Sequence, residues 1–373
     1  MRKFTYLLLI SIIFSCSKKD DIIGTWVEKD NFNLPVIIEF DEDFFYNILS
    51  KQDLQMYKLK NDTFITQRYG FLEKMKFNIS GNSLSFYNIE SDSLLVTYER
   101  LNSLNFIDYF NEKLNANINL VNYASQNLNP YNEVISLYLD KDLNNETILY
   151  INGKEATLDS LLYLKLFNRN ERYWESKIYV FVDNELPISE LNKVKIELRK
   201  AMQFRISYIT SEKNGYLFGT HAKLPPIEFD YPDSIDMSLF PPPPPKPIYP
   251  VGKEFFNKSI LLEVYREQIT LNDTLSSFDN FKNLLETKLI NGDKPIVHFY
   301  IDEQLEYERY IKLLIDTKNI YYSLRNQFSK EYFNENDYNE LHFEKSDSIV
   351  SLFPMMINEI EIEELQEIKK YAL

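Results

Sequence analysis

The sequence predicts a multidomain protein in which an all-β domain is followed by two related α/β (α+β) domains. Short alternating strands separated by turn residues occupy residues 22–100. Two later regions, 134–241 and 251–373, share the same order of expected strands and helices and several short matching segments. A proline-rich stretch, 242–250, separates those two regions and marks a domain boundary.

The first residues form a processing signal and are set aside from the fold. Arg2 and Lys3 precede the apolar run Phe4–Phe14, which is short for crossing a bilayer, and Cys16 follows it. This segment resembles a bacterial lipoprotein signal peptide. The resemblance implies cleavage of residues 1–15 and lipidation of Cys16, and the alternative interpretation is an uncleaved anchor helix.

Cys16 is the only cysteine, so an intrachain disulfide is excluded and the single thiol lies where acyl chains would be attached. Several acyl chains hold a protein stably on a membrane. The lipidated tether 16–21 resembles the surface-export signal of Bacteroidetes-type lipoproteins, and a plain solvated tether is the alternative. We therefore expect a lipid-anchored protein of the cell envelope, in the outer membrane, on its periplasmic face or at the cell surface.

The composition limits the possible partners. The chain has 373 residues and 44% hydrophobic content, enough for two or three cores. A net charge of -15 argues against nucleic acid or an anionic lipid surface as the main partner. The 8 glycines include no phosphate-cradling loop, and we expect no cofactor.

Residues 22–100 are expected to form a small antiparallel barrel or a curled sheet. Asn61-Asp62 and Gly81-Asn82 stand between alternating runs, where tight turns are expected. The expected strands are 22–27, 36–40, 44–48, 55–59, 63–66, 74–79, 83–86 and 94–98.

Four segments of this region resemble the lipocalin-like domains of bacterial lipoproteins: Gly24–Trp26, Tyr57–Phe64, Ile79–Phe86 and Thr97–Arg100. The resemblance implies that Gly24 and Trp26 close the floor of the barrel. The barrel could hold a small apolar ligand, or it could be filled by its own side chains and act as a spacer. The second interpretation is favoured because small barrels are commonly filled in this way.

Two segments are expected to connect the domains. Residues 101–133 form a connector with one helix near Leu104–Leu114. The proline-rich linker 242–250 predicts a semi-rigid polyproline strut of up to about 30 Å. Its alternative role is a docking motif for an aromatic groove.

Internal matches predict that the regions 134–241 and 251–373 arose by duplication. Asp233–Pro241 (DSIDMSLFP) resembles Asp347–Pro354 (DSIVSLFP) at an offset of 114 residues, and offsets elsewhere change only between elements. The other matches pair 227–230 with 341–344 at 114, 180–183 with 299–302 at 119, 151–152 with 271–272 and 158–159 with 278–279 at 120, and 134–139 with 260–265 at 126.

Each region is expected to contain a hairpin, a helix, a buried strand, a second helix and a further strand, giving helices on a mixed sheet. The expected elements after the hairpin are 158–167, 177–182, 188–202 and 204–209 in the first region, and 278–290, 295–301, 307–314 and 320–324 in the second.

This order resembles the periplasmic domains of the biopolymer-transport proteins ExbD and TolR. The matching positions are Leu149–Gly153 and Val180–Asp183, then Ile269–Asn272 and Phe299–Asp302. The resemblance implies dimeric domains that contact envelope transport proteins or peptidoglycan. It does not extend to proton coupling, because the family's membrane helix with its aspartate is missing from the sequence, and we expect the two copies to pair as an internal pseudo-dimer.

No residue constellation points to catalysis or metal binding. Asp183 and Asp302 end equivalent strands, where acidic side chains commonly shape turns. The histidines, His221, His298 and His342, lack ligand spacing, and only His298 lies in a core-like run.

The acidic tail, Asn358–Tyr371, could be a partner helix or a solvated face with Ile360, Leu365 and Ile368 packed inward. Taken together, we expect a non-catalytic envelope lipoprotein that is accessory to an energised transport system. The alternative function is a carrier of a small apolar ligand.

Overall fold

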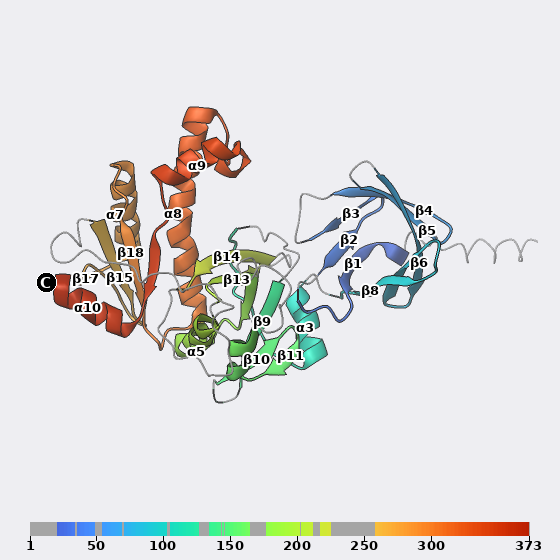
Figure 1. The fold of residues 1–373 in the computed structure, drawn as a ribbon, viewed down its shortest axis with the longest axis horizontal. Coiled ribbons are helices and arrows are strands. Elements are labelled where there is room, and N and C mark those ends of the chain that lie inside the picture. Colours follow the sequence, from blue (N-terminus) through green and yellow to red (C-terminus); the bar gives the residue numbers. More distant parts are fainter. Residues whose placement is uncertain are drawn as a thin grey trace, which may run out of the picture.

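The chain folds into a barrel and two sheets with helices, arranged in a row (Figure 1). The computed structural model describes residues 21–33, 36–48, 54–68, 71–102, 105–126, 134–142, 144, 146–164, 177–201, 203–211, 217–224 and 258–372. The expected signal peptide, Cys16 and the proline-rich linker 242–250 lie outside the described residues.

The amino-terminal domain is a closed antiparallel barrel of eight strands, which confirms the predicted all-β class. It closes because β1 pairs with both β2 and β8. The strands are β1 (Gly24–Glu28), β2 (Ile37–Phe40), β3 (Phe44–Asn47), β4 (Gln55–Lys60), β5 (Thr63–Arg68), β6 (Phe71–Ser80), β7 (Ser83–Asn88) and β8 (Leu94–Arg100).

Aromatic side chains fill the interior of the barrel. Phe64 packs against Phe45, Tyr57 and Phe86 with ring centroids 5.5, 5.3 and 5.2 Å apart. Phe40 stacks on Phe45 at 5.5 Å. These residues alternate with outward-facing ones along their strands, so the period-two pattern of the sequence places their rings inside.

Helix α3 (Phe106–Leu114) leads from the barrel to the first sheet. This sheet has the strand order β11-β10-β9-β12-β13-β14, in which β9, β12 and β13 are parallel. Its elements are β9 (Val134–Lys141), β10 (Thr147–Ile151), β11 (Lys154–Ala156), η1 (Leu158–Tyr163), β12 (Lys177–Val182), α5 (Ile188–Lys200), β13 (Arg205–Ser211) and β14 (Leu217–Lys223).

The second sheet has the order β17-β16-β15-β18-β19, which repeats the first five positions of the first sheet, including its three parallel strands. Its elements are β15 (Ser259–Val264), β16 (Ile269–Leu271), β17 (Thr274–Ser276), α7 (Phe278–Ile290), β18 (Ile296–Ile301), α8 (Tyr307–Phe333), η3 (Tyr338–Glu340), α9 (Phe343–Leu352), β19 (Ile357–Ile360) and α10 (Ile362–Ala372). A common origin of the two halves stays a prediction.

Two asparagines with positive φ make the same contacts in both sheets. The Ser136 N–H donates to Asn152 Oδ1, and the Leu261 N–H donates to Asn272 Oδ1, each at 2.9 Å. These bonds align β9 with β15 at an offset of 125 residues, so the predicted offset of 126 is wrong by one. The error matters because a slip of one residue turns every side chain of a strand to the opposite face.

The strand expected at Ile320–Leu324 is also wrong, because these residues continue α8. The strand that takes the place of β13 in the second sheet is β19, which was expected to be part of the acidic tail. Asp347–Pro354 therefore precedes the β13 equivalent, in α9 and the turn after it, whereas Asp233–Pro241 follows β14 in the chain and lies outside the described residues. Topology does not support this match, nor that of 227–230 with 341–344.

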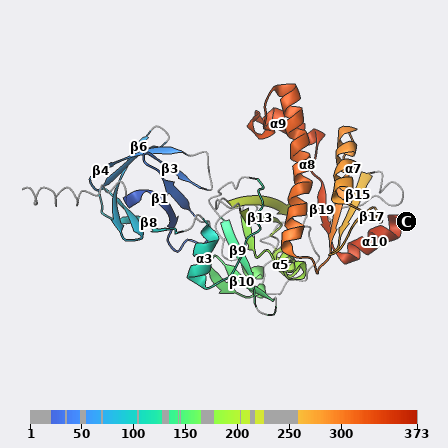
Figure 2. The ribbon, with the colours of Figure 1, turned by 180° about the vertical axis from the view of Figure 1, so that it is seen from behind.

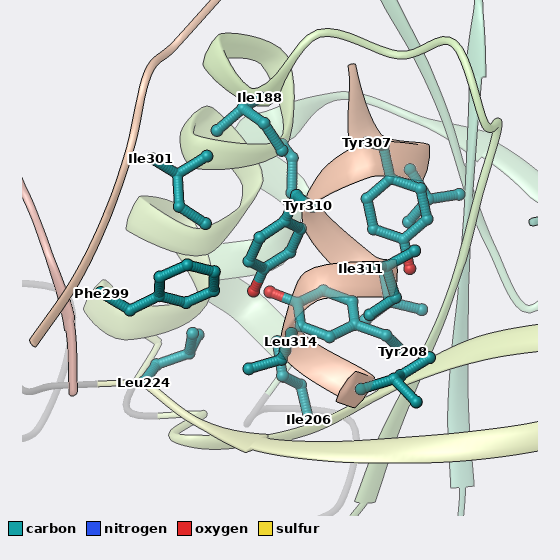
Figure 3. Packing of buried hydrophobic residues seen from close by; sticks show 14 of the residues in the cluster. Ile188, Ile206, Tyr208, Leu224, Phe299, Ile301, Tyr307, Tyr310, Ile311 and Leu314 are labelled. Atoms are coloured by element: carbon teal, nitrogen blue, oxygen red, sulfur yellow. The ribbon is translucent and has the colours of Figure 1, made fainter. Parts of the chain in front are cut away.

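Helices α5 and α8 lie between the two sheets, and one apolar core joins all four elements (Figures 1 and 2). Tyr310 of α8 contacts Tyr208 of the first sheet and Phe299 of the second, with centroids 5.8 and 6.3 Å apart (Figure 3). The outer faces of the sheets are covered by α3 and α10. Leu365 and Ile368 of α10 pack inward as predicted.

Candidate functional site

The segments that follow β12 and β18 contact each other, and the hydrogen bonds between them form a two-fold symmetric pattern. Pro187 and Glu306 form an isolated antiparallel bridge. Each hydrogen bond donated by the first half to the second has an equivalent bond donated in the opposite direction, and equivalent positions of the two halves are 119 residues apart. This reciprocal pattern is that of an isologous dimer interface. The four bonds are Ile188 N–H to Leu305 O, Tyr307 N–H to Leu186 O, Ser189 N–H to Glu303 O and Glu308 N–H to Asn184 O, all 2.9 Å.

Asp183 and Asp302 begin these two segments and shape their turns. Asp183 accepts a hydrogen bond from the Glu185 N–H at 3.1 Å, and Asp302 accepts one from the Gln304 N–H at 2.8 Å. Asp183 is fully buried and lies 3.6 Å from the Lys141 ammonium. The two aspartates therefore position the chain for the two-fold contact.

Beside this contact, a cavity of about 240 Å³ opens between α5 and the end of β19. The Lys195 ammonium lies 2.7 Å from the Glu359 carboxylate and 4.8 Å from the centre of the Tyr310 ring. The Tyr310 hydroxyl donates to the other Glu359 oxygen at 2.7 Å. Arg199 and Glu361 form a second ion pair across the same cavity. Two cations of the first half thus hold two carboxylates of the second.

Burial and pairing set the ionisation of this cluster. Burial opposes ionisation of Glu359, but the Lys195 ammonium and the Tyr310 hydroxyl outweigh it, so the pKa of Glu359 lies below its usual value. Burial raises the pKa of Tyr310 well above its usual value, so its phenol stays protonated and can donate. Burial lowers the pKa of the nearby Lys318 to about 8, although the Glu359 charge opposes that shift.

The ion pairs of the cluster hold the two halves together, and Lys195 and Glu359 are engaged with each other. A general acid or base needs an ordered reaction partner, whereas Lys195 and Glu359 neutralise each other. Within the described parts of the chain, no group of three His, Cys, Asp or Glu side chains could hold a metal ion. His298 is fully buried on β18, His221 lies on β14 with its Nδ1 2.6 Å from Ser207 Oγ, and His342 precedes α9.

Gly24 and Trp26 lie where β1 enters the barrel. The Trp26 ring is fully buried, and its Nε1 donates to the Ile22 carbonyl at 2.7 Å. The Arg100 guanidinium lies 4.3 Å from the centre of that ring and donates to the Ile23 carbonyl at 2.8 Å. Gly24 has φ +124°, and a Cβ there would lie 2.8 Å from Arg100. Arg100 therefore holds the backbone at the start of β1 in place beside the Trp26 ring.

Sequence reasoning did not identify Lys195, Glu359 or the cavity between them, because their residues are far apart along the chain. None of the helices among the described residues is long and apolar enough to cross a membrane. Comparisons of the chain with models of protein families, with curated proteins and with solved structures find no match.

Proposed function

We propose that this protein is a membrane-anchored lipoprotein of the cell envelope that binds a protein partner or the cell wall and has no catalytic activity. It serves as an accessory to an energised transport system of the TonB or Tol type. The observation that carries the proposal is the two-fold contact between two sheets of the same strand order.

The pairing supports this role because it matches what the resemblance to ExbD and TolR domains implies. Domains of that kind work as dimers, and the two halves here make isologous backbone bonds within one chain. The ion pairs of Lys195 with Glu359 and Arg199 with Glu361 join the same halves. We infer that the halves form a permanent pseudo-dimer.

The barrel fits a spacer next to the lipid anchor better than a carrier of a small apolar ligand. Its interior positions are taken by packed rings from Phe40 to Phe86. A fluorescent fatty-acid analogue tested on the full chain separates these roles. Saturable displacement by lipid would support the carrier, whereas a signal equal to that of buffer is expected for the spacer.

The proposed function is tested by affinity purification of the tagged protein from its own envelope in mild detergent. A Cys16→Ala variant, which lacks the acylated thiol, is the matched control. We expect transport-motor, receptor or cell-wall components to be enriched with the anchored protein only. Recovery of the protein alone, or with lipid, contradicts the accessory role.

A further inference from the structure

The second half carries an element that has no counterpart among the described residues of the first half. In the first half, α5 ends at Lys200 and β13 begins at Arg205. In the second half, residues 320–356 separate the equivalent part of α8 from β19, and we name these residues the arm. The arm consists of the second part of α8, η3 and α9, and it projects beyond the sheets (Figure 1).

A buried arginine fixes the shape of the arm. Arg325 is 5% exposed and donates to the Phe353 carbonyl from Nη2 at 2.7 Å and from Nε at 3.1 Å. Its Nη1 lies 3.2 Å from the Tyr338 hydroxyl. Asn334 ends α8 in the left-handed conformation with φ 57°. The returning chain is therefore held against α8 before any partner binds, which reduces the entropy lost on binding.

The arm exposes an apolar patch that its own packing does not cover. Tyr332 is 60% exposed and stacks on Phe328 at 4.1 Å, and Phe328 contacts Phe353 at 5.8 Å. Leu352, the neighbour of Phe353, is 46% exposed. We call these four residues the arm patch. Tyrosine and phenylalanine are enriched at protein interfaces, where they supply much contact area at a small entropic cost.

The charges of the arm select the partner. Six carboxylates lie in the arm, against two lysines and the buried Arg325. Such a surface repels nucleic acid and anionic lipid and attracts cationic protein segments. The carboxylates belong to Glu331, Glu335, Asp337, Glu340, Glu344 and Asp347.

We propose that the arm is the partner-binding element and that its partner is a basic protein segment with apolar side chains, such as a cationic amphipathic helix. Apolar anchors would pack on the arm patch while Lys or Arg side chains meet the carboxylates of the arm. This inference rests on the proposed function, and it assigns the binding of the partner to the arm.

The first test uses a synthetic amphipathic helix of Leu and Lys as the probe, with a Leu and Glu helix of the same pattern as its control. Fluorescence anisotropy with the full chain is expected to show saturable, salt-sensitive binding of the Lys probe only. Tyr332→Ser, and separately the pair Glu331→Lys and Glu335→Lys, should each weaken it by about tenfold. The matched control Phe71→Ser removes a ring that is 75% exposed on the barrel and should leave binding unchanged. Equal binding to all variants overturns the proposal.

The second test replaces Tyr332 by a photo-crosslinking phenylalanine analogue in the anchored protein in its own cells, with Phe71 as the control position. We expect a crosslink from position 332 alone, to a segment of net positive charge. If purification recovers a partner but the crosslink arises at position 71, or position 332 gives none, the arm is not the binding element although the proposed function stands. If purification recovers no partner, the proposed function fails, whatever the probe does.

Discussion

Gly153 lies where the contact between the barrel and the first sheet leaves no space for a side chain. Its φ is +77°, and a Cβ there would lie 2.4 Å from the ring of Phe32, in the loop after β1. Phe32 packs on Tyr109 and Phe110 of α3, so this ring ties the barrel to the first sheet. The equivalent position of the second half is Asp273, which also has positive φ but meets Lys369 instead.

We therefore predict that Gly153→Ala destabilises the protein by about 2–4 kcal/mol, because backbone strain adds to the displacement of Phe32. Gly292→Ala is the matched control, since Gly292 has φ +85° but no atom within 4 Å of its would-be Cβ. Urea unfolding of the two variants isolates the clash. Equal losses of stability would show that Phe32 moves freely and does not fix the barrel.

A second prediction concerns the fully buried His298. Burial lowers the pKa of its imidazole to about 4, whereas the unfolded side chain titrates near 6.5. Between these values the unfolded chain binds a proton that the folded chain does not, so stability falls as the pH is lowered. The loss reaches on the order of 3 kcal/mol by about pH 4. In the His298→Leu variant, the free energy of unfolding measured with urea should change less between pH 6.5 and 4 than in the wild type. An equal change in both proteins would show that His298 does not cause this pH dependence.

A third prediction concerns Glu359, whose removal leaves a buried cation without its partner. Glu359→Gln should cost about 3 kcal/mol at pH 7, and a second substitution, Lys195→Met, should restore most of that loss. Because the pKa of Glu359 is lowered, its contribution is present above about pH 4.3 and disappears as the pH falls through the folded value. Urea titrations at pH 7 and at successively lower pH should therefore show a difference from wild type that is largest at pH 7 and shrinks as Glu359 is protonated. A difference that stays the same at every pH would point to lost packing instead.

At the level of elements, the barrel could be predicted because alternation along each strand follows directly from burial of one face. The segment Ile320–Leu324 could not, since its run of β-branched and aromatic residues has high strand propensity. In the structure Tyr321 and Leu324 lie on the buried face of α8, and packing overrides propensity. Strand β19 was missed because its glutamates resemble a solvated tail, whereas Glu359 is largely shielded from solvent and pairs with Lys195, which is 164 residues away. No local pattern carries that information.

The rigidity of the arm gives a prediction at the same level. Arg325→Met should remove the bonds to Phe353 and Tyr338 and raise hydrogen exchange over residues 334–353, with little change in the sheets. Lys330→Met, an exposed change five residues further along α8, is the control. Hydrogen exchange measured by mass spectrometry checks this, and unchanged protection in Arg325→Met would show that other contacts hold the arm.

For the whole molecule, the shared core predicts that the two sheets unfold together. Tyr208 of the first sheet contacts Tyr307 and Tyr310 of the second half at 6.0 and 5.8 Å. Tyr208→Ala should cost about 3–5 kcal/mol and raise hydrogen exchange in residues 134–224 and 258–372 alike. Phe86→Ala, in the separate barrel core, should affect residues 22–100 instead. Loss of protection in the first sheet alone would refute a common unfolding unit.

The arm has a consequence for stoichiometry. Two identical subunits related by a two-fold axis would present two arms and would bind two partners or bridge them. Here the pairing is symmetric, but among the described residues the arm belongs to the second half alone. If the arm binds the partner as we propose, one chain offers a single binding site. Because the two halves belong to one chain, dilution cannot separate them and exchange between copies cannot mix them.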